Sequence, residues 1–266
     1  MLFRSHFGMY SPPQSMGESL DPFINFNEFH MDRPTFPPHP HAGFSVLTYL
    51  FEDSPSAIIN RDSLGDHSRI APGGLHWTQA GRGVQHEENP ERPYKNTHGF
   101  QLWVNHSGDN RLIEPKAVHA DPNEIPEAFP TSGARVRILA SQAFDQHATF
   151  TPMTPITLLE VHLEPHISLH LNAPHDQTAF LTIIRGAGSA GDQTLETHAL
   201  ATFEPDGDSI HLNAGADGLN ALFGAGKPLL EETVFGGPFV MSNPQQLLEA
   251  QLRFRRGEMG ALESSA

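Results

Sequence analysis

Short apolar runs of strand length recur along the whole chain and limit what it can fold into. They are rich in β-branched and aromatic residues, and glycine- and proline-containing turns separate them. Such a regular alternation of short strands and turns predicts an all-β protein built as a sandwich or barrel. The clearest runs cover residues 44–51, 99–104, 135–140, 156–163 and 179–184.

One helix is expected, close to the C-terminus. Asn243 is a good N-cap and Pro244 suits the first turn of the apolar-periodic segment PQQLLEAQLRFRR. The arginines at the end of this segment complement a helix dipole, and their alternative interpretation is a nucleic-acid contact. We interpret the segment as a packing helix.

The chain divides into two similar halves. Residues 121–130 are acidic, rich in proline and without periodicity, which is typical of a linker. A constant shift of 134 positions places Pro40-His41 on Pro174-His175 and Leu47-Thr48 on Leu181-Thr182. We interpret this as an internal duplication and expect two β-barrel domains, residues 1–130 and residues 131–266, with the helix in the second.

Composition excludes several classes of function. The chain has no cysteine, so disulfides, thiolate metal sites and a cysteine nucleophile are excluded. Its formal net charge of −15 disfavours direct binding to nucleic acid. No stretch is apolar for long enough to span a membrane, and the first residues lack the apolar region of a signal peptide. A cytoplasmic location is therefore expected.

Two histidine-containing pairs in the first half predict a metal site. His39 and His41 are two residues apart, as are His86 and Glu88, and on strands such positions face the same side. Two neighbouring strands would bring three imidazoles and one carboxylate together. This sulfur-free set suits Fe(II), Mn, Ni, Cu or Zn, and it leaves coordination positions open for catalysis.

Each pair also has a simpler interpretation, because short motifs have a high false-positive rate. His39 and His41 can be exposed residues beside a proline, His86 a hydrogen-bonded loop residue, and Glu88 a solvated charge. His162 and Glu164 repeat the second pattern without a partner pair, so we interpret them as outward polar residues of a strand.

The second half is expected to be free of metal, because the shift of 134 removes three of the four ligand types. His39 falls on Ala173, His41 on His175, His86 on Asn220 and Glu88 on Leu222.

The segments HPHAGF, WTQAGRGVQHEE, GFQLWVN and GPFVMSN resemble the pirin family, in order and over almost the whole chain. The resemblance implies a bicupin, two cupin β-barrels with one metal, usually iron, in the N-terminal barrel. The family's metal-ligand positions match His39, His41, His86 and Glu88. It also implies a monomer.

The chain departs from the family pattern near this site. Related sequences often carry a glutamate where Ser45 stands, which leaves Glu88 as the expected carboxylate ligand. The usual WMTAG reads WTQAG, with Thr78 and Gln79 changed, so metal preference and pocket polarity can differ from those of relatives.

Pirins are similar to quercetin dioxygenases, which implies that a flavonol-like substrate is opened with O2. Glu88 would then act as the catalytic base, and Arg82 and Trp77 either support the ligands or serve structure alone. One alternative is a metal-binding or redox-sensing regulator that acts through a protein partner. Another is a storage or structural bicupin.

Overall fold

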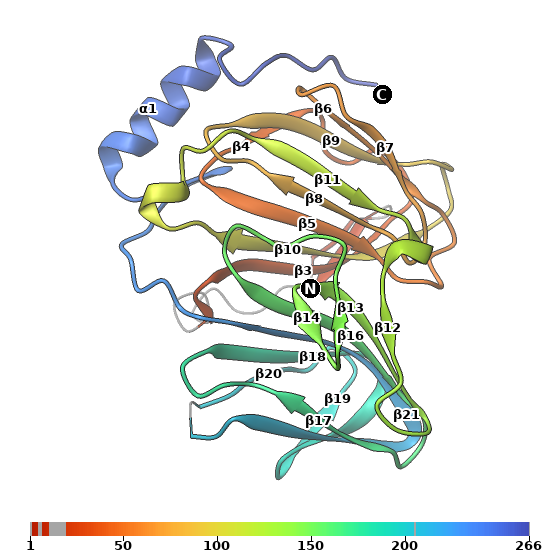
Figure 1. Cartoon of the computed structure of the whole chain (residues 1–266). Coiled ribbons are helices and arrows are strands. Elements are labelled where there is room, and N and C mark those ends of the chain that lie inside the picture. Colours follow the sequence, from red (N-terminus) through yellow and green to blue (C-terminus); the bar gives the residue numbers. More distant parts are fainter. Residues whose placement is uncertain (1, 5–6, 11–19, 205, 266) are drawn as a thin grey trace. The chain divides into compact units, whose positions relative to one another are not determined.

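The structure, a computed structural model, describes residues 2–4, 7–10, 20–204 and 206–265. Within these residues the regular structure is almost entirely β-strand (Figure 1). The described part contains one α-helix, α1 (Pro244–Arg255), and two short 3₁₀ helices at Gly108–Asn110 and Pro122–Glu124. The expected all-β class is confirmed.

Contacts within the chain define two compact units. The first contains Phe23–Asn123 and the chain from Leu229 onward, and the second contains Glu124–Pro228 with a short stretch that ends at Pro22. This division places α1 in the first unit, whereas the sequence placed it in the second half. The helix joins the first unit because its buried Ala250, with Leu247 and Phe254 partly buried, packs on Ala42 and Met241.

The first unit contains two larger sheets that share a core, and a separate two-stranded sheet, β22-β23. One sheet has the strand order β1-β2-β3-β10-β5-β8-β11, and the other has the order β4-β9-β6-β7. Phe29 and Leu50 of the first sheet pack against Ile58 and Ile70 of the second. The strands are β1 (Leu2–Arg4), β2 (Phe7–Tyr10), β3 (Phe23–Met31), β4 (His39–His41), β5 (Phe44–Leu50), β6 (Ile58–Asp62), β7 (His67–Ile70), β8 (Leu75–Gln79), β9 (Val84–Pro90), β10 (Thr97–Asn105), β11 (Lys116–Ala120), β22 (Val234–Gly236) and β23 (Phe239–Met241).

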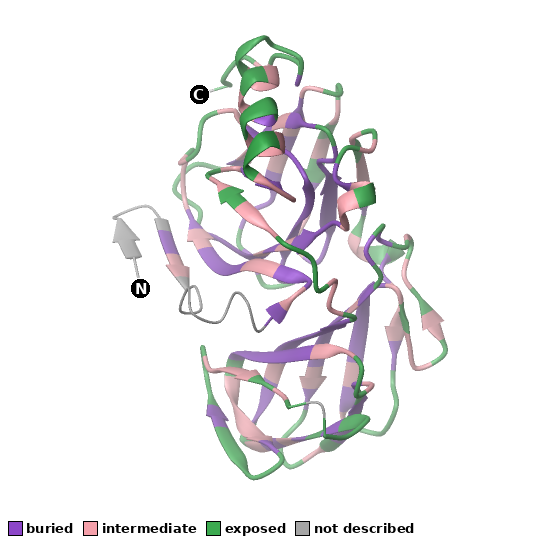
Figure 2. Ribbon diagram, turned by 90° about the vertical axis from the view of Figure 1, so that its left-hand side faces the viewer, coloured by how far each residue is buried: buried purple, intermediate pink, exposed green. Residues whose placement is uncertain are grey.

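The second unit is organised around one sheet of eight strands. Its central path is β12-β13-β16-β21-β18-β19, with β17 also paired to β21 and β20 to β18. The buried residues of this sheet form one continuous apolar core, seen as purple in the ribbons of Figure 2. The strands are β12 (Glu127–Ala128), β13 (Ala134–Ala140), β14 (Gln142–Ala143), β15 (Gln146–His147), β16 (Ile156–Leu163), β17 (Ser168–Asn172), β18 (Thr178–Ala190), β19 (Gln193–Glu196), β20 (Leu200–Thr202) and β21 (Ser209–Gly226).

The sequence-based elements agree well with these strands. All five apolar runs fall on strands, and α1 begins where expected, with the Asn243 side chain accepting a hydrogen bond from the backbone N–H of Gln246 at 2.9 Å. The expected linker is partly ordered, because residues 127–128 pair with β13. No helix in the described part of the chain is long and apolar enough to cross a membrane.

Candidate metal centre

The first unit brings the HxH and HxE pairs together on two neighbouring strands. β4 and β9 are antiparallel, and their register sets His39 directly opposite His86. His41 and His86 are buried, at 2% and 1% exposure, while His39 is partly exposed at the edge of the group. Strand alternation turns both β4 histidines to the same side, as the two-residue spacing predicts.

The three imidazole rings meet edge to face. Their centroids are 4.7–4.8 Å apart, with interplanar angles of 86° for His39 and His41, 63° for His39 and His86, and 68° for His41 and His86. One nitrogen of each ring lies within 4.8 Å of the other two. Rings at steep angles to one another can direct their lone pairs at a common point, which is the geometry that one metal ion requires.

The Nε2 atoms of His39 and His86 are 3.2 Å apart. Two nitrogens that each lie about 2.1 Å from one ion subtend an angle of about 100° at that separation, between the octahedral and tetrahedral values. His39 Nδ1 lies 2.9 Å from the carbonyl oxygen of Pro37, which can only accept, so Nδ1 carries the proton and Nε2 keeps its lone pair. The carbonyl oxygen of Pro37 therefore orients the His39 ring.

Burial keeps the histidines neutral, the form that binds metal. Desolvation lowers the pKa of His41 to about 3, with a further contribution from His39. Desolvation also places the pKa of His86 well below the ordinary value and lowers that of His39. Among the described residues, His41 Nε2 has no hydrogen-bond partner although it is buried. Such an atom is costly unless something binds it, and a metal ion fits.

Glu88 lies beside this group but not within its tight core. It shares the inward side of β9 with His86, and its Oε2 accepts hydrogen bonds from Thr48 Oγ1 at 2.9 Å and Gln101 Nε2 at 3.4 Å. Burial raises the pKa of Glu88 to about 7, while those two hydrogen bonds act in the opposite direction. A carboxyl with such a pKa can give or take a proton near neutral pH. Its role as a fourth ligand stays a prediction.

Sequence reasoning missed the polar side chains that hold Glu88. Thr48 and Gln101 face each other across β5 and β10, and Trp103 Nε1 donates to Gln101 Oε1 at 3.2 Å. The Trp103 ring also lies 5.2 Å from that of His41. These residues stand inside runs interpreted only as apolar strands. The sequence did contain a signal, because Gln101 and Trp103 are two residues apart and therefore face the same side of their strand.

Ser45 occupies the place where related sequences often carry glutamate. It is buried, and its hydroxyl donates to His106 Nε2 at 2.7 Å. His106 Nδ1 faces the carbonyl oxygen of Asn110 at 3.3 Å, so Nδ1 bears the proton and Nε2 accepts. Desolvation lowers the pKa of His106 to about 4. A neutral serine–histidine pair thus replaces a carboxylate at this position.

Arg82 and Gln79 contact Glu114, while Trp77 and Thr78 are buried on β8. Arg82 is exposed and forms an ion pair of 2.9 Å with Glu114. Gln79 donates to the carbonyl oxygen of Glu114 at 2.9 Å. Trp77 and Thr78 are buried within β8. The structure therefore shows packing and loop-anchoring contacts for these residues.

A second group of ligand-type side chains in the first unit has a different geometry. Glu28, His30 and His98 lie together on β3 and β10. His98 Nε2 lies 2.8 Å from Glu28 Oε1, and the two rings stack at 4.2 Å with an interplanar angle of only 12°. One ion cannot lie in the planes of two parallel stacked rings. This group is hydrogen-bonded rather than arranged for a metal.

Strand pairing shows how the two halves correspond. β5 lies between β10 and β8, and Leu47 faces Leu102 and Trp77. β18 lies between β21 and β20, and Leu181 faces Phe223 and Ala201. The shift of 134 therefore holds for β5 and β18, but Trp77 and Ala201 are only 124 positions apart, and Leu102 and Phe223 are 121 apart.

The ungapped alignment of His86 with Asn220 and Glu88 with Leu222 is therefore wrong. Both partners lie in the part of β21 that corresponds to β10, because the second half has shorter connections. The counterpart of β9 is residues 209–213, which pair with β17 as β9 pairs with β4. Inward positions on these two segments carry the apolar Leu169, Leu171, Ile210 and Leu212.

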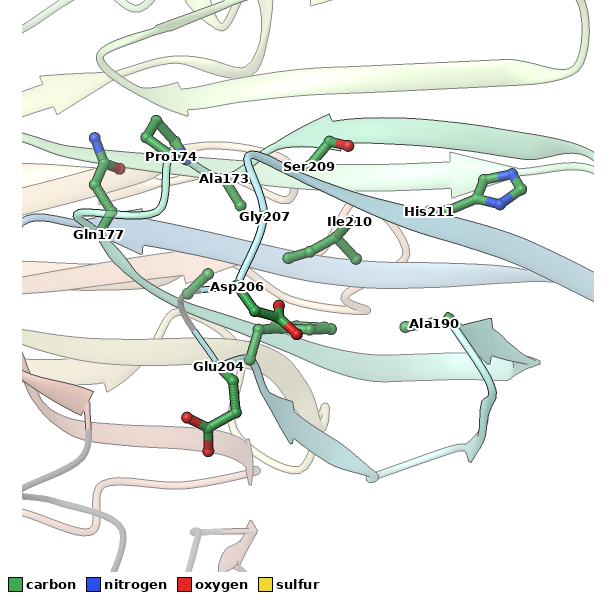
Figure 3. A pocket seen from close by; sticks show the side chains of 13 residues that line it. Ala173, Pro174, Gln177, Ala190, Glu204, Asp206, Gly207, Ser209, Ile210 and His211 are labelled. Carbon is green, nitrogen blue, oxygen red and sulfur yellow. The ribbon is translucent and has the colours of Figure 1, made fainter.

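The second unit has a pocket of about 150 Å³ at this place (Figure 3). Ala173, Ala190 and Ile210 line its inner part, whereas Glu204 and Asp206 are exposed at its rim. His175, the counterpart proposed for His41, is exposed and pairs with Asp208 at 2.8 Å. The inner part of this pocket is thus lined mainly by small and branched apolar side chains rather than by a group of three histidines.

These features define a two-barrel cupin with a histidine-rich centre in its N-terminal barrel. Residues 5–104 match the Pirin family model, and residues 158–260 match the model of the Pirin C-terminal cupin domain. The chain belongs to the pirin family.

Similar proteins support this assignment over the full length. A putative pirin-like protein of Arabidopsis thaliana is 34% identical, covering 96% of this chain and 94% of that protein. Human pirin is 34% identical over 91% of this chain and 84% of its own length. A crystal structure of quercetin 2,3-dioxygenase from Acinetobacter baumannii has a TM-score of 0.84 and 25% identity, with 96% of this chain and 98% of that chain covered.

Proposed function

We propose that this pirin is a metal-dependent dioxygenase that opens a flavonol such as quercetin with O2. The observation that carries the proposal is the group formed by His39, His41 and His86, whose rings meet edge to face and of which His41 and His86 are buried. The likeness to a quercetin 2,3-dioxygenase supports the substrate class. Fe(II) is the proposed metal, and Glu88 the proposed fourth ligand.

The residues have distinct roles in this proposal. His39, His41 and His86 hold the ion through neutral nitrogens, and when bound the ion supplies Lewis acidity and a place for substrate oxygens and O2. Glu88 accepts the proton of the flavonol hydroxyl as the general base. Thr48 and Gln101 hold that carboxylate in place. Phe44 and Trp103, stacked beside His41, offer an apolar wall that limits water.

The test combines metal analysis with oxygen uptake on adding quercetin, after reconstitution with each of Fe(II), Mn, Ni, Cu and Zn. We expect about one metal per chain, as one three-histidine group implies, and uptake that is lost in His41→Ala. Metal binding without uptake under every reconstitution would refute the dioxygenase and favour the metal-binding regulator. An absence of metal binding would refute the centre itself.

A further inference from the structure

β9 presents a second set of side chains on the side opposite to the metal centre. His86 and Glu88 point to the interior, and strand alternation sends Gln85, Glu87 and Asn89 to the other side. All three of these outer residues contact one segment, the C-terminal tail Met259–Ser265. Figure 1 shows the end of the chain beside β6 and β9.

The tail is bound through hydrogen bonds along the strand. Gln85 Nε2 donates to the carbonyl oxygen of Gly260, and Asn89 Nδ2 donates to Ser265 Oγ at 3.1 Å. The backbone N–H of Ser265 donates to Glu87 Oε1 at 3.2 Å. The tail therefore runs along β9 from Gln85 to Asn89, the segment that contains His86 and Glu88.

Two glycines allow this close approach. Gly83 has φ of +134°, and a Cβ there would lie 2.5 Å from Met259 Cγ. Gly260 has φ of +77°, and a Cβ there would lie 2.6 Å from Ser63 Cβ. Ser63 Oγ in turn donates to the carbonyl oxygen of Met259 at 2.8 Å and accepts from the N–H of Gln85 at 3.0 Å. Larger side chains at either glycine would push the tail away from the strand.

Glu87 is the centre of these contacts. Its side chain is 1% exposed and accepts a hydrogen bond of 2.7 Å from Arg61 Nη1, directly across the ladder on β6. Arg61 also donates to the carbonyl oxygen of Glu263 at 3.3 Å. The Glu87 carboxylate thus connects β6, β9 and the tail through hydrogen bonds, and Glu87 is the residue between His86 and Glu88.

We infer that Glu87 is a positioning residue for the metal centre and that the C-terminal tail is its partner. The inference rests on the proposed metal centre. Removing the Glu87 carboxylate removes the hydrogen bonds from Arg61 and from the tail to the outer side of β9. The backbone that orients His86 and Glu88 is then less firmly held in place. Partners that hydrogen-bond a ligand directly typically contribute about 10- to 100-fold to metal affinity, and for Glu87, which acts through the backbone, we expect about 10-fold.

The experiment measures metal affinity by competition with a chelating dye and records the visible spectrum of the Co(II) form. Five proteins are compared with the full chain: Glu87→Ala, Glu87→Gln, a chain that ends at Gly260, the same truncated chain carrying Glu87→Ala, and Glu91→Ala. The truncated chain keeps Met259, which packs in the apolar core of the unit. Glu91 is the matched control, because it pairs with Arg69 at 2.6 Å on the exposed surface just beyond β9.

Glu87→Ala and the truncated chain are expected to bind about 10-fold more weakly, with an altered Co(II) spectrum. Combining them adds little further loss, because both remove the same contact. Glu87→Gln keeps an acceptor oxygen and restores affinity close to that of the full chain, and Glu91→Ala leaves it unchanged. Folded Glu87→Ala and truncated chains with native affinity and spectrum overturn the inference. A full chain that binds no metal removes the proposed centre as well, which distinguishes the two failures.

Discussion

His39 Nε2 and His86 Nε2 lie 3.2 Å apart across the β4–β9 ladder, each on a ring fixed by a different strand. The positions of these two histidines are therefore set by the register between β4 and β9, and not by a loop. A one-residue slip between β4 and β9 would turn one histidine pair outward. Ligand substitutions are therefore expected to act on metal binding without dissolving the surrounding sheets.

Replacing His41 by Ala should abolish metal binding, whereas replacing His175 should leave it intact. His41 is buried in the histidine group, while His175 is exposed and paired with Asp208 in the other unit. Metal content by elemental analysis after reconstitution checks this. Far-UV circular dichroism of the apo chain should stay that of a β protein, because both units have apolar cores. Loss of the ion in the His175 variant would contradict our assignment.

The sequence predicted the strands and the meeting of the two histidine pairs because both follow from alternation. An i, i+2 pair needs only a strand to face one way, and the runs around residues 44–51 and 99–104 were strongly strand-like. The family resemblance then fixed which histidines to consider. What remained open was the position of Glu88, since its contacts with Thr48 and Gln101 depend on register between β9 and strands of the other sheet.

Which strands of the two halves are equivalent could be determined only from the structure. An ungapped shift cannot represent a second half in which one long strand, β21, replaces β9 and β10 with their connection. The grouping of α1 and the tail with the first unit could not be predicted from the sequence either. The contacts of the tail with this unit join residues about 170 to 200 positions apart, such as Ser63 and Met259. Local patterns carry no information on such pairings.

Ser45→Ala should destabilise the protein by about 1–3 kcal/mol, because it leaves the buried Nε2 of His106 without its donor. The change removes one oxygen and adds no bulk. Urea unfolding at pH 7 measures the effect, with metal content unchanged. Ser54→Ala is a useful comparison, since that buried hydroxyl donates to the carbonyl oxygen of Ser56 at 2.8 Å and accepts from the backbone N–H of His98 at 3.0 Å. Equal stability of Ser45→Ala and the native chain would contradict the assigned hydrogen bond.

Acid should destabilise the apo protein from about pH 6.5 downward. Burial lowers the pKa of His76 and of His106 from the ordinary value of 6.5 to about 4. Between about pH 6.5 and pH 4 each of these histidines is therefore protonated in the unfolded chain but neutral in the native state. The free energy of unfolding then falls as pH falls, by about 1.4 kcal/mol per pH unit for each such histidine. Below their native pKa of about 4 these two histidines no longer contribute to the slope.

The variant His106→Asn isolates one of these contributions. Asn keeps polar atoms at the site but does not titrate, so its slope between pH 6 and pH 5 should be shallower by about 1.4 kcal/mol per pH unit. Urea unfolding of the apo chains at a series of pH values provides the comparison. Parallel slopes for native and His106→Asn chains would show that His106 is not buried and neutral.

Leu171→Ala tests the corrected correspondence of the two halves. Leu171 is fully buried on β17, the counterpart of β4, and faces Ile210 across the ladder. Truncating it should cost about 2–5 kcal/mol of unfolding free energy. The neighbouring Asn172 points outward, so Asn172→Ala should change stability by no more than about 0.5 kcal/mol. Metal content should be native in both variants, because the ligands lie in the other unit. Loss of metal in folded Leu171→Ala would place a ligand in the second unit and refute the assignment of the centre to β4 and β9.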